Sequence, residues 1–135
     1  GDIVYDPAES VALDGNSGPY LQYAHARASS ILSKAGGQME EERKKRKDEL
    51  QPEERLLLRK ITEYNDVVEK ATSELMPHHV CTYLYELAQE FNRFYEKNRV
   101  IGDDRQAVRV HLVSLYRDRL AHGLELLGIT APQQM

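Results

Sequence analysis

Apolar residues recur every three or four positions along most of this 135-residue chain, and glycine or proline interrupts the pattern at only a few places. Such spacing puts apolar side chains on one face of an α-helix. No stretch alternates polar and apolar residues for long enough to indicate a β-sheet. The sequence therefore predicts an all-α fold, a bundle of four to five helices with an irregular N-terminal loop.

Glycine and proline set the expected ends of the first helix. Pro19 suits a first helical turn, and the Gly36-Gly37 pair suits a helix end. No breaker lies between them, so we expect a helix from Tyr20 to about Ala35.

Three further helices are expected. The second starts at Pro52, the third covers about residues 77–98, and the fourth covers about residues 104–127 and ends before Gly128. The second carries one apolar stripe along its length, formed by Leu57, Ile61, Tyr64, Val68 and Ala71. Similar stripes on the third and fourth consist of Val80, Leu84, Leu87, Phe91 and Phe94, and of Val108, Leu112, Leu115, Tyr116, Leu120, Leu124 and Leu127.

Two segments do not fit this pattern. Residues 1–18 form a loop by composition, because turn pairs such as Asp14-Gly15 leave no room for a long regular element. Residues 38–50 are the most highly charged stretch, which is typical of a solvent-exposed helix or of a linker. The expected organisation is therefore a loop over residues 1–18, then one helical domain over residues 19–135 that includes this charged helix or linker.

The net charge, the single cysteine and the histidines exclude few classes of protein by themselves. The net charge of −4 counts weakly against a nucleic-acid binder, although an acidic protein can still present one basic or aromatic face. The single cysteine, Cys81, excludes an internal disulfide framework and is compatible with the cytosol. His78 and His79 point about 100° apart on a helix, so they cannot easily share a metal ion. We expect no metal site, structural or surface histidines, and a small core residue at Cys81.

Motifs of catalysis and of membrane insertion are not found in the sequence. The glycines fit no phosphate-binding loop, and no Gly-x-Ser-x-Gly nucleophile elbow occurs. No apolar run approaches the roughly 20 residues that span a bilayer, and residues 1–5 do not resemble a signal peptide. The sequence therefore predicts no catalytic residue and no membrane partner.

The most informative side chains lie on the first expected helix. Tyr20, Tyr23 and Arg27 are spaced by three and four residues, so they share one side of that helix. Aromatic rings stack on unpaired bases, and an arginine binds a phosphate or stacks on a base. By itself this pattern is more typical of an aromatic helix face buried in a bundle.

A longer string of residues decides between these interpretations. The run Gly18-Pro19-Tyr20-Leu21-Gln22-Tyr23-Ala24-His25-Ala26-Arg27 resembles the segment that opens the anticodon-binding domain of arginyl-tRNA synthetases. A second block, from Glu74-Leu75 to Arg99-Val100, contains Phe91-Asn92 and Phe94-Tyr95-Glu96. A third block closes the chain with Leu126-Leu127-Gly128-Ile129, Ala131-Pro132 and Met135. All three blocks resemble that family in order and spacing.

The resemblance implies both a function and a set of RNA-binding residues. Members of the family are class I ligases that join arginine to its tRNA with ATP and magnesium in the cytoplasm, and their C-terminal helical bundle binds the anticodon stem-loop. The implied contacts of arginine tRNA are Tyr20, Tyr23, Arg27, Tyr95 and Met135. The enzyme's own catalytic domain is the other implied partner, and DNA is not. The final methionine suggests a natural C-terminus.

This sequence also departs from the family pattern. The two signature sequences for ATP activation are absent, so these residues alone are expected to be inactive and to hold no cofactor. The nearest match to the Asp-Ala-Leu-Arg string that names the domain is Asp104 with Ala107-Val108-Arg109. Gln133-Gln134 stands where an acidic and a basic residue are usual, which puts a charge-based contact there in doubt.

The expected mechanism follows from the genetic code. Every arginine codon has G at its second position, so every arginine tRNA has C in the middle of its anticodon. We expect the anticodon bases to stack on Tyr20, Tyr23 or Tyr95 while Arg27 holds a phosphate or a flipped base. Backbone groups near residues 14–20 or the C-terminal carboxylate are candidates for contacts to the edge of the cytosine. The alternatives are a helical protein-interaction module, the related domain of another class I synthetase, and a small metalloenzyme.

Overall fold

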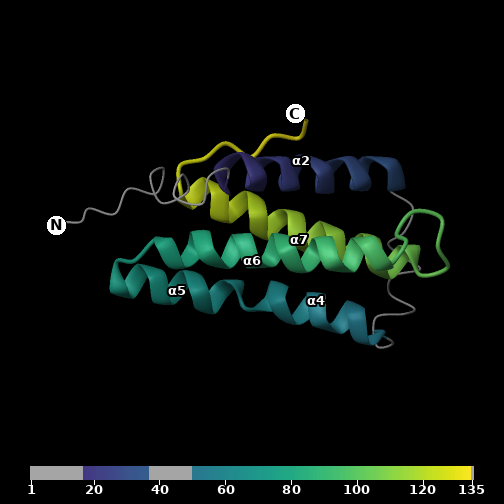
Figure 1. The fold of residues 1–135 in the computed structure, drawn as a ribbon, viewed down its shortest axis with the longest axis horizontal. Coiled ribbons are helices and arrows are strands. Elements are labelled where there is room, and N and C mark those ends of the chain that lie inside the picture. Colours follow the sequence, from purple (N-terminus) through teal and green to yellow (C-terminus); the bar gives the residue numbers. More distant parts are fainter. Residues whose placement is uncertain (1–16, 37–49, 135) are drawn as a thin grey trace.

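Figure 1 shows a computed structural model of the chain, which describes residues 17–36 and 50–134. Within these residues the chain forms helices and no strands, so the predicted all-α class is confirmed. The helices are α2 (Ser17–Ala35), α4 (Pro52–Thr62), α5 (Tyr64–Glu74), α6 (His78–Lys97) and α7 (Gln106–Leu126). The predicted loop up to residue 16 and the charged stretch up to residue 49 lie outside the described residues.

The helices form a bundle in which α6 and α7 occupy the middle. α2 packs mainly on α7, while α4 and α5 pack on α6. In Figure 1, α2 therefore runs along one side of the bundle, and α4 and α5 run along the opposite side. The chain after α7 turns back and follows α2 toward the C-terminus (Figure 1).

The first helix begins earlier than the sequence predicted. α2 starts at Ser17, so Ser17 and Gly18 belong to its first turn and not to the preceding loop. The N–H groups of a first turn have no partner within the helix, so Pro19 loses no hydrogen bond there. The proline therefore sits inside the first turn.

The end of α7 directs the chain back along the bundle. Gly128 adopts a left-handed conformation with φ +75°, which a glycine adopts without steric cost. The N–H of Ile129 donates to the carbonyl of Leu124 at 2.8 Å, and the N–H of Gly128 donates to that of Glu125 at 3.0 Å. These two bonds form a Schellman motif, which confirms the predicted end of this helix and reverses the direction of the chain.

The core consists of the apolar stripes that the sequence predicted. All five stripe residues of α6 and nearly all of those of α7 are buried: Val80, Leu84, Leu87, Phe91, Phe94, Val108, Leu112, Tyr116, Leu120, Leu124 and Leu127. Each of the aliphatic and phenylalanine side chains among them contributes about 1.5–3 kcal/mol by leaving water. At Gly123 of α7 an added Cβ would lie 2.7 Å from the Cδ1 atom of Leu84, so glycine lets α6 and α7 approach closely. No helix of the described residues is long and apolar enough to span a membrane.

The second predicted helix is interrupted, and Tyr83 of α6 accounts for the interruption. α4 ends at Thr62 and α5 begins at Tyr64. The buried Tyr83 hydroxyl donates to the carbonyl oxygens of Lys60 and Ile61, the second at 3.1 Å. In a continuous helix these carbonyls would accept from N–H groups four residues on, and a side chain inserted into that ladder kinks the helix. The prediction of one helix was therefore wrong at this point.

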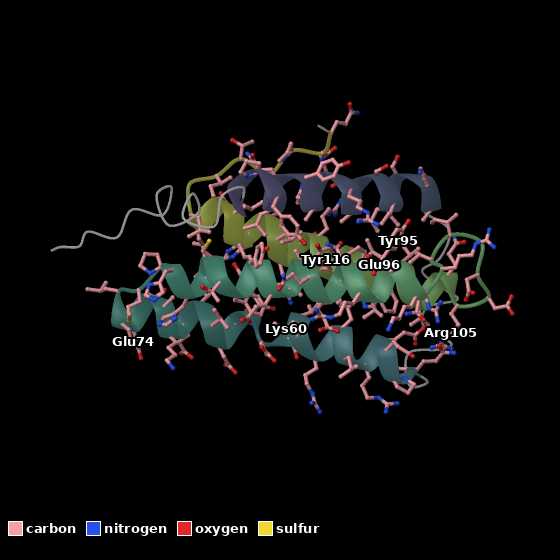
Figure 2. All side chains as sticks on the ribbon, viewed as in Figure 1. Lys60, Glu74, Tyr95, Glu96, Arg105 and Tyr116 are labelled. Atoms are coloured by element: carbon pink, nitrogen blue, oxygen red, sulfur yellow. The ribbon has the colours of Figure 1, made fainter. Side chains whose placement is uncertain are left out.

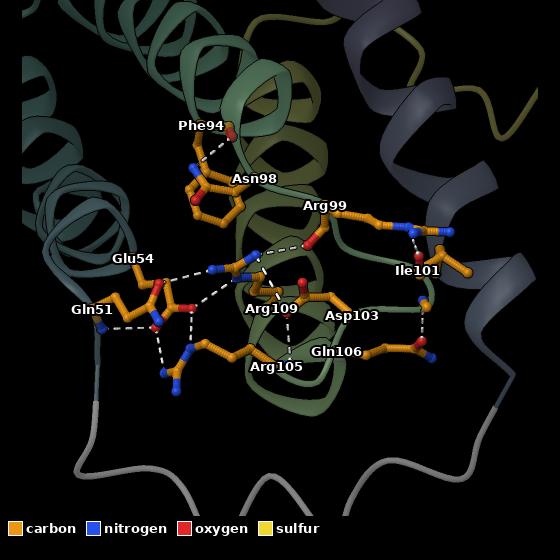
Figure 3. Close-up of polar contacts among 11 residues, drawn as sticks. Gln51, Glu54, Phe94, Asn98, Arg99, Ile101, Asp103, Arg105, Gln106 and Arg109 are labelled. Carbon is orange, nitrogen blue, oxygen red and sulfur yellow. Dashed lines mark hydrogen bonds and ion pairs between the residues drawn. The ribbon is translucent and has the colours of Figure 1, made fainter.

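A buried ion network joins the start of α4 to α7. Glu54 is fully buried and accepts from Arg105 Nε at 2.6 Å and from Arg109 Nε at 2.8 Å (Figure 3). Burial opposes the ionisation of Glu54, but bonds from Arg105, Arg109 and the Gln51 backbone N–H outweigh it and hold the pKa of Glu54 below its usual value. The carboxylate therefore stays charged in the core.

The same network contains the arginine of the nearest match to the Asp-Ala-Leu-Arg string. Arg109, the arginine of the nearest match, is 5% exposed and lies in the network of Figure 3. Besides its bond to Glu54, it donates to the backbone carbonyl of Arg99 at 2.8 Å and to the amide oxygen of Gln51 at 2.9 Å. These bonds tie together α4, α7 and the loop after α6, so this arginine stabilises the fold.

Candidate nucleic-acid interface

An open groove of about 480 Å³ lies where α2, α6 and the C-terminal tail meet. Arg27 and Lys34 line it, and among the residues that the structure describes no carboxylate does. The lining residues within the described part of the chain are Tyr23, Ala26, Arg27, Ser30, Ile31, Lys34, Tyr95, Gln133 and Gln134. In a chain with net charge −4, this surface is locally cationic.

One face of α2 supplies the aromatic and cationic part of the groove. Tyr23, Arg27, Ser30 and Lys34 are separated by four, three and four residues, the spacing of one helical face. The Tyr23 side chain is 63% exposed. A large aromatic ring that the fold leaves in water is available to stack on another planar group.

Arg27 lies over the ring of Tyr95. The guanidinium carbon is 4.6 Å from the ring centroid, within the range of a cation–π contact. Tyr95 stacks in turn on Phe91, with centroids 5.7 Å apart and planes 17° apart, and Phe91 stacks on the buried Tyr116 at 4.2 Å and 9°. Figure 2 places Tyr95 and Tyr116 between the α2 and α6 ribbons. This series of rings fixes Tyr95, and Arg27 is the exposed member of the Arg27–Tyr95 pair.

Tyr20 takes a different place from Tyr23. It is half-buried and does not line the groove. Its hydroxyl accepts a hydrogen bond from Asn92 Nδ2 at 2.8 Å, and its ring lies 5.1 Å from that of Tyr85. Burial, followed by the neighbouring Tyr85, raises the pKa of Tyr20. The Tyr20 side chain therefore lies outside the groove with its hydroxyl neutral. That hydroxyl contacts Asn92, which in turn contacts Arg27.

Asn92 connects Tyr20 to Arg27. Its side chain on α6 is half-buried, and its Oδ1 atom accepts from Arg27 Nη1 at 3.3 Å. No local pattern in the sequence indicates this role, because the two partners lie 65 and 72 residues away in the chain.

Two residues of α2 hold the tail that forms the other wall. Gln22 Nε2 donates to the Thr130 carbonyl at 3.1 Å, and His25 Nδ1 bonds to the Pro132 carbonyl at 2.5 Å. A carbonyl oxygen only accepts, so His25 carries its proton on Nδ1. The tail thereby runs beside α2, and Gln133 and Gln134 reach the groove.

The structure thus brings Tyr23, Arg27 and Tyr95 together at one groove and keeps Tyr20 behind it. Met135, also implied as a contact, lies outside the described residues, although its neighbour Gln134 lines the groove. Sequence reasoning missed Ser30, Lys34, Asn92 and the residues that hold the tail. For Ser30 and Lys34 the signal was present, since they continue the helical face of Tyr23 and Arg27.

His78, His79 and Cys81 do not line this groove. The rings of His78 and His79 are 4.5 Å apart at the start of α6, and His79 Nε2 is 3.7 Å from the Glu74 carboxylate. Cys81 is buried in the core, as predicted. Among the residues that the structure describes, no group of three or more His, Cys, Asp or Glu side chains could hold a metal ion.

Comparison with known proteins identifies the family. The family model described as the DALR anticodon binding domain matches residues 21–135. The arginine–tRNA ligase of Aliivibrio fischeri is 38% identical over 139 residues, which cover 99% of this chain and 24% of the relative. The arginine–tRNA ligase of Thermobifida fusca is 41% identical over 144 residues, which cover 99% of this chain and 24% of that relative. The chain thus spans about a quarter of the length of these relatives.

A solved structure agrees with these matches. The arginyl-tRNA synthetase of Thermus thermophilus superposes with a TM-score of 0.77 at 36% identity, over 87% of this chain and 21% of that one. The fold, and a sequence match over most of the chain, therefore point to the same domain. The chain belongs to the family of DALR anticodon binding domains.

Proposed function

We propose that this chain is the anticodon-binding part of an arginine–tRNA ligase and that its groove binds the anticodon loop of arginine tRNA. The observation that carries the proposal is the groove itself, where Lys34, the exposed Tyr23 and the Arg27–Tyr95 pair lie together and none of the described lining residues is a carboxylate. Family membership and relatives named arginine–tRNA ligase support it.

The two cations account for attraction to the RNA backbone. Arg27 and Lys34 lie seven residues apart on α2, which is two helical turns or roughly 10 Å. The logarithm of affinity falls linearly with the logarithm of the salt concentration. In single-stranded nucleic acid, each phosphate that a cation neutralises adds about −0.7 to the slope of that line. Contacts from both residues therefore contribute about −1.4.

The aromatic side chains account for contacts to the bases. Stacking on an aromatic ring contributes about 1–3 kcal/mol per base and tolerates any base. Tyr23 offers its ring to solvent directly. At Tyr95 the Arg27 guanidinium lies over the ring, so a base stacks on the guanidinium or replaces it there.

Selection of the middle cytosine requires polar groups at its pairing edge. The side-chain amides of Gln133 and Gln134 lie at the groove, and an amide can accept from the cytosine amine and donate to its ring nitrogen. Gln133 and Gln134 are therefore candidates for contacts to the edge of the cytosine. Backbone groups near residues 14–20 and the carboxylate of Met135 stay further candidates.

The wider activity belongs to the longer protein. We propose that it joins arginine to its tRNA in the cytoplasm, with ATP and magnesium, and that its catalytic domain is the second partner of this bundle. The described residues hold no candidate metal cluster, and no step of that chemistry is assigned to them.

The proposal is tested by titrating this chain into a fluorescent anticodon stem-loop of arginine tRNA at several salt concentrations. We expect affinity to fall steeply with salt, and Lys34→Ala to make the slope shallower by about 0.7. The matched control is Arg59→Ala, which removes an exposed cation of α4 on the opposite side of the bundle. Absence of salt-sensitive binding by a folded chain would contradict the proposal and favour a protein-interaction module.

A further inference from the structure

Asn92 lies between two residues of α2 and contacts both. Its Oδ1 atom accepts from Arg27 and its Nδ2 atom donates to the Tyr20 hydroxyl. An arginine has only donors, so the amide oxygen must face Arg27 and the NH₂ group must face Tyr20. The amide is therefore held in one orientation.

Tyr20 restricts the position of this amide through the hydrogen bond to its hydroxyl. Its side chain is half-buried, and its ring contacts that of Tyr85 with centroids 5.1 Å apart. A ring packed in this way has little freedom, so its hydroxyl fixes the position of Asn92. The contacts then run from Tyr20 to Asn92, from Asn92 to Arg27, and from Arg27 to the Tyr95 ring.

Arg27 needs such support, because it is exposed and its side chain is long. Ordering a flexible arginine when RNA binds costs conformational entropy, and a side chain ordered beforehand avoids part of that cost. A carboxylate would also hold the guanidinium, but it would neutralise the charge that a phosphate must meet. A neutral amide holds it and leaves the full charge for the RNA.

We propose that Asn92 is a positioning residue of this groove, whose neutral amide holds the Arg27 guanidinium over Tyr95 before RNA binds. The role rests on the RNA-binding function proposed above. It gives Asn92 an effect on affinity without a contact to the RNA, and that effect operates through Arg27.

A double-mutant cycle tests whether the effect operates through Arg27. The affinity for the arginine anticodon stem-loop is measured for the wild-type chain, Asn92→Ala, Arg27→Ala and the double variant. We expect Asn92→Ala to weaken binding roughly three- to tenfold in the wild-type background and less than about twofold when Arg27 is already alanine. An equal loss in both backgrounds, or no loss in the first, would overturn the proposal.

Asn92→Asp separates positioning from a structural role. Its carboxylate can accept from both Arg27 and the Tyr20 hydroxyl, so the fold keeps both bonds. A merely structural Asn92 would be rescued by this change. We expect instead that affinity stays low and that the salt slope becomes shallower by about 0.7, because Arg27 no longer meets a phosphate with its full charge. Gln89→Ala, which removes a half-buried amide of α6 outside the groove, is the control.

A measurement without RNA keeps this proposal distinct from the proposed function. The Nε–H resonance of Arg27 should be shifted by the ring current of Tyr95 in the free wild-type chain and should lose that shift in Asn92→Ala. A shift that persists in Asn92→Ala would overturn the positioning role even if the chain binds RNA. If the wild-type chain binds no RNA, the proposed function fails first, and the role of Asn92 in RNA binding fails with it.

Discussion

His25 and Pro132 lie 107 residues apart in the chain, yet the His25 imidazole donates from Nδ1 to the Pro132 carbonyl oxygen. The imidazole is buried, with 4% of its surface exposed. Together with the bond from Gln22 to Thr130, this contact holds the tail against α2. It also keeps Gln133 and Gln134 beside Arg27 and Tyr23 at the groove. The position of one groove wall thus depends on Gln22 and on the buried His25.

Removal of that histidine should release the tail. In His25→Ala the Pro132 carbonyl loses its donor, a net loss of about 0.5–1.5 kcal/mol, so we expect the tail to become mobile and the affinity for the stem-loop to fall. Heteronuclear NOE measurements at Gln133 and Gln134 report the mobility, because they detect motion on the picosecond to nanosecond timescale.

His25→Asn is the matched control for this prediction. The asparagine Nδ2 atom stands where the histidine Nδ1 atom stood, so it can donate to Pro132 and should keep the tail more ordered than alanine does. Tail residues that remain as rigid in His25→Ala as in the wild-type chain would contradict the assignment of this role.

The Glu54 network predicts a large effect on stability. Glu54→Ala leaves Arg105 and Arg109 without the buried carboxylate that they contact, and Arg109 then keeps an ion pair to Asp103 at 3.6 Å. Removal of one partner of a buried ion pair costs about 3–5 kcal/mol. Denaturant unfolding of the variant measures this loss. Glu53→Ala changes an exposed acid in the same turn and should stay within about 0.5 kcal/mol. Similar losses for both variants would contradict the network's importance.

The same carboxylate predicts a dependence of stability on pH. The folded pKa of Glu54 lies below its ordinary value of 4.5, so its contribution is fully present above that pH and is lost as pH falls through the folded pKa. The stability difference between the wild-type chain and Glu54→Gln should therefore shrink as the pH is lowered below 4.5. Unfolding curves at a series of acidic pH values test this, and a constant difference would argue against it.

Replacement of Leu75 by glycine should stabilise the chain. It ends α5 in a left-handed conformation with φ 54° and is 85% exposed. That conformation costs a residue with a side chain about 1–2 kcal/mol, and glycine recovers part of it, so Leu75→Gly should raise the free energy of unfolding by about 0.5–1 kcal/mol. Leu56→Gly, at an exposed leucine inside α4, should have the opposite effect. The prediction fails if both substitutions destabilise the chain.

Local patterns in the sequence predicted most of the helices. Pro52, Pro77 and Gly128 mark ends that the structure confirms to within a residue or two, because these residues restrict the backbone where they stand. The break at Glu63 was not predictable in this way. Its cause is the Tyr83 hydroxyl, which comes from another helix and bonds to the Lys60 and Ile61 carbonyls.

The groove was predictable only in part, for the same reason. Tyr23, Arg27 and Tyr95 followed from helical spacing and from the resemblance to a known family. Asn92 and His25 did not, because their roles depend on partners far away in the chain. The spacing that put Tyr20 beside Tyr23 also could not indicate that Tyr20 turns toward Tyr85 and away from the groove.

The proposed function requires that the groove recognises the middle base of the arginine anticodon. The most direct measurement compares the affinity of this chain for the arginine anticodon stem-loop with its affinity for the same stem-loop carrying G in place of the middle C. A base read at its pairing edge is discriminated by about 1–3 kcal/mol, so we expect binding to the C form to be roughly five- to 150-fold tighter. Equal affinity for the two stem-loops would contradict recognition of that base by this groove.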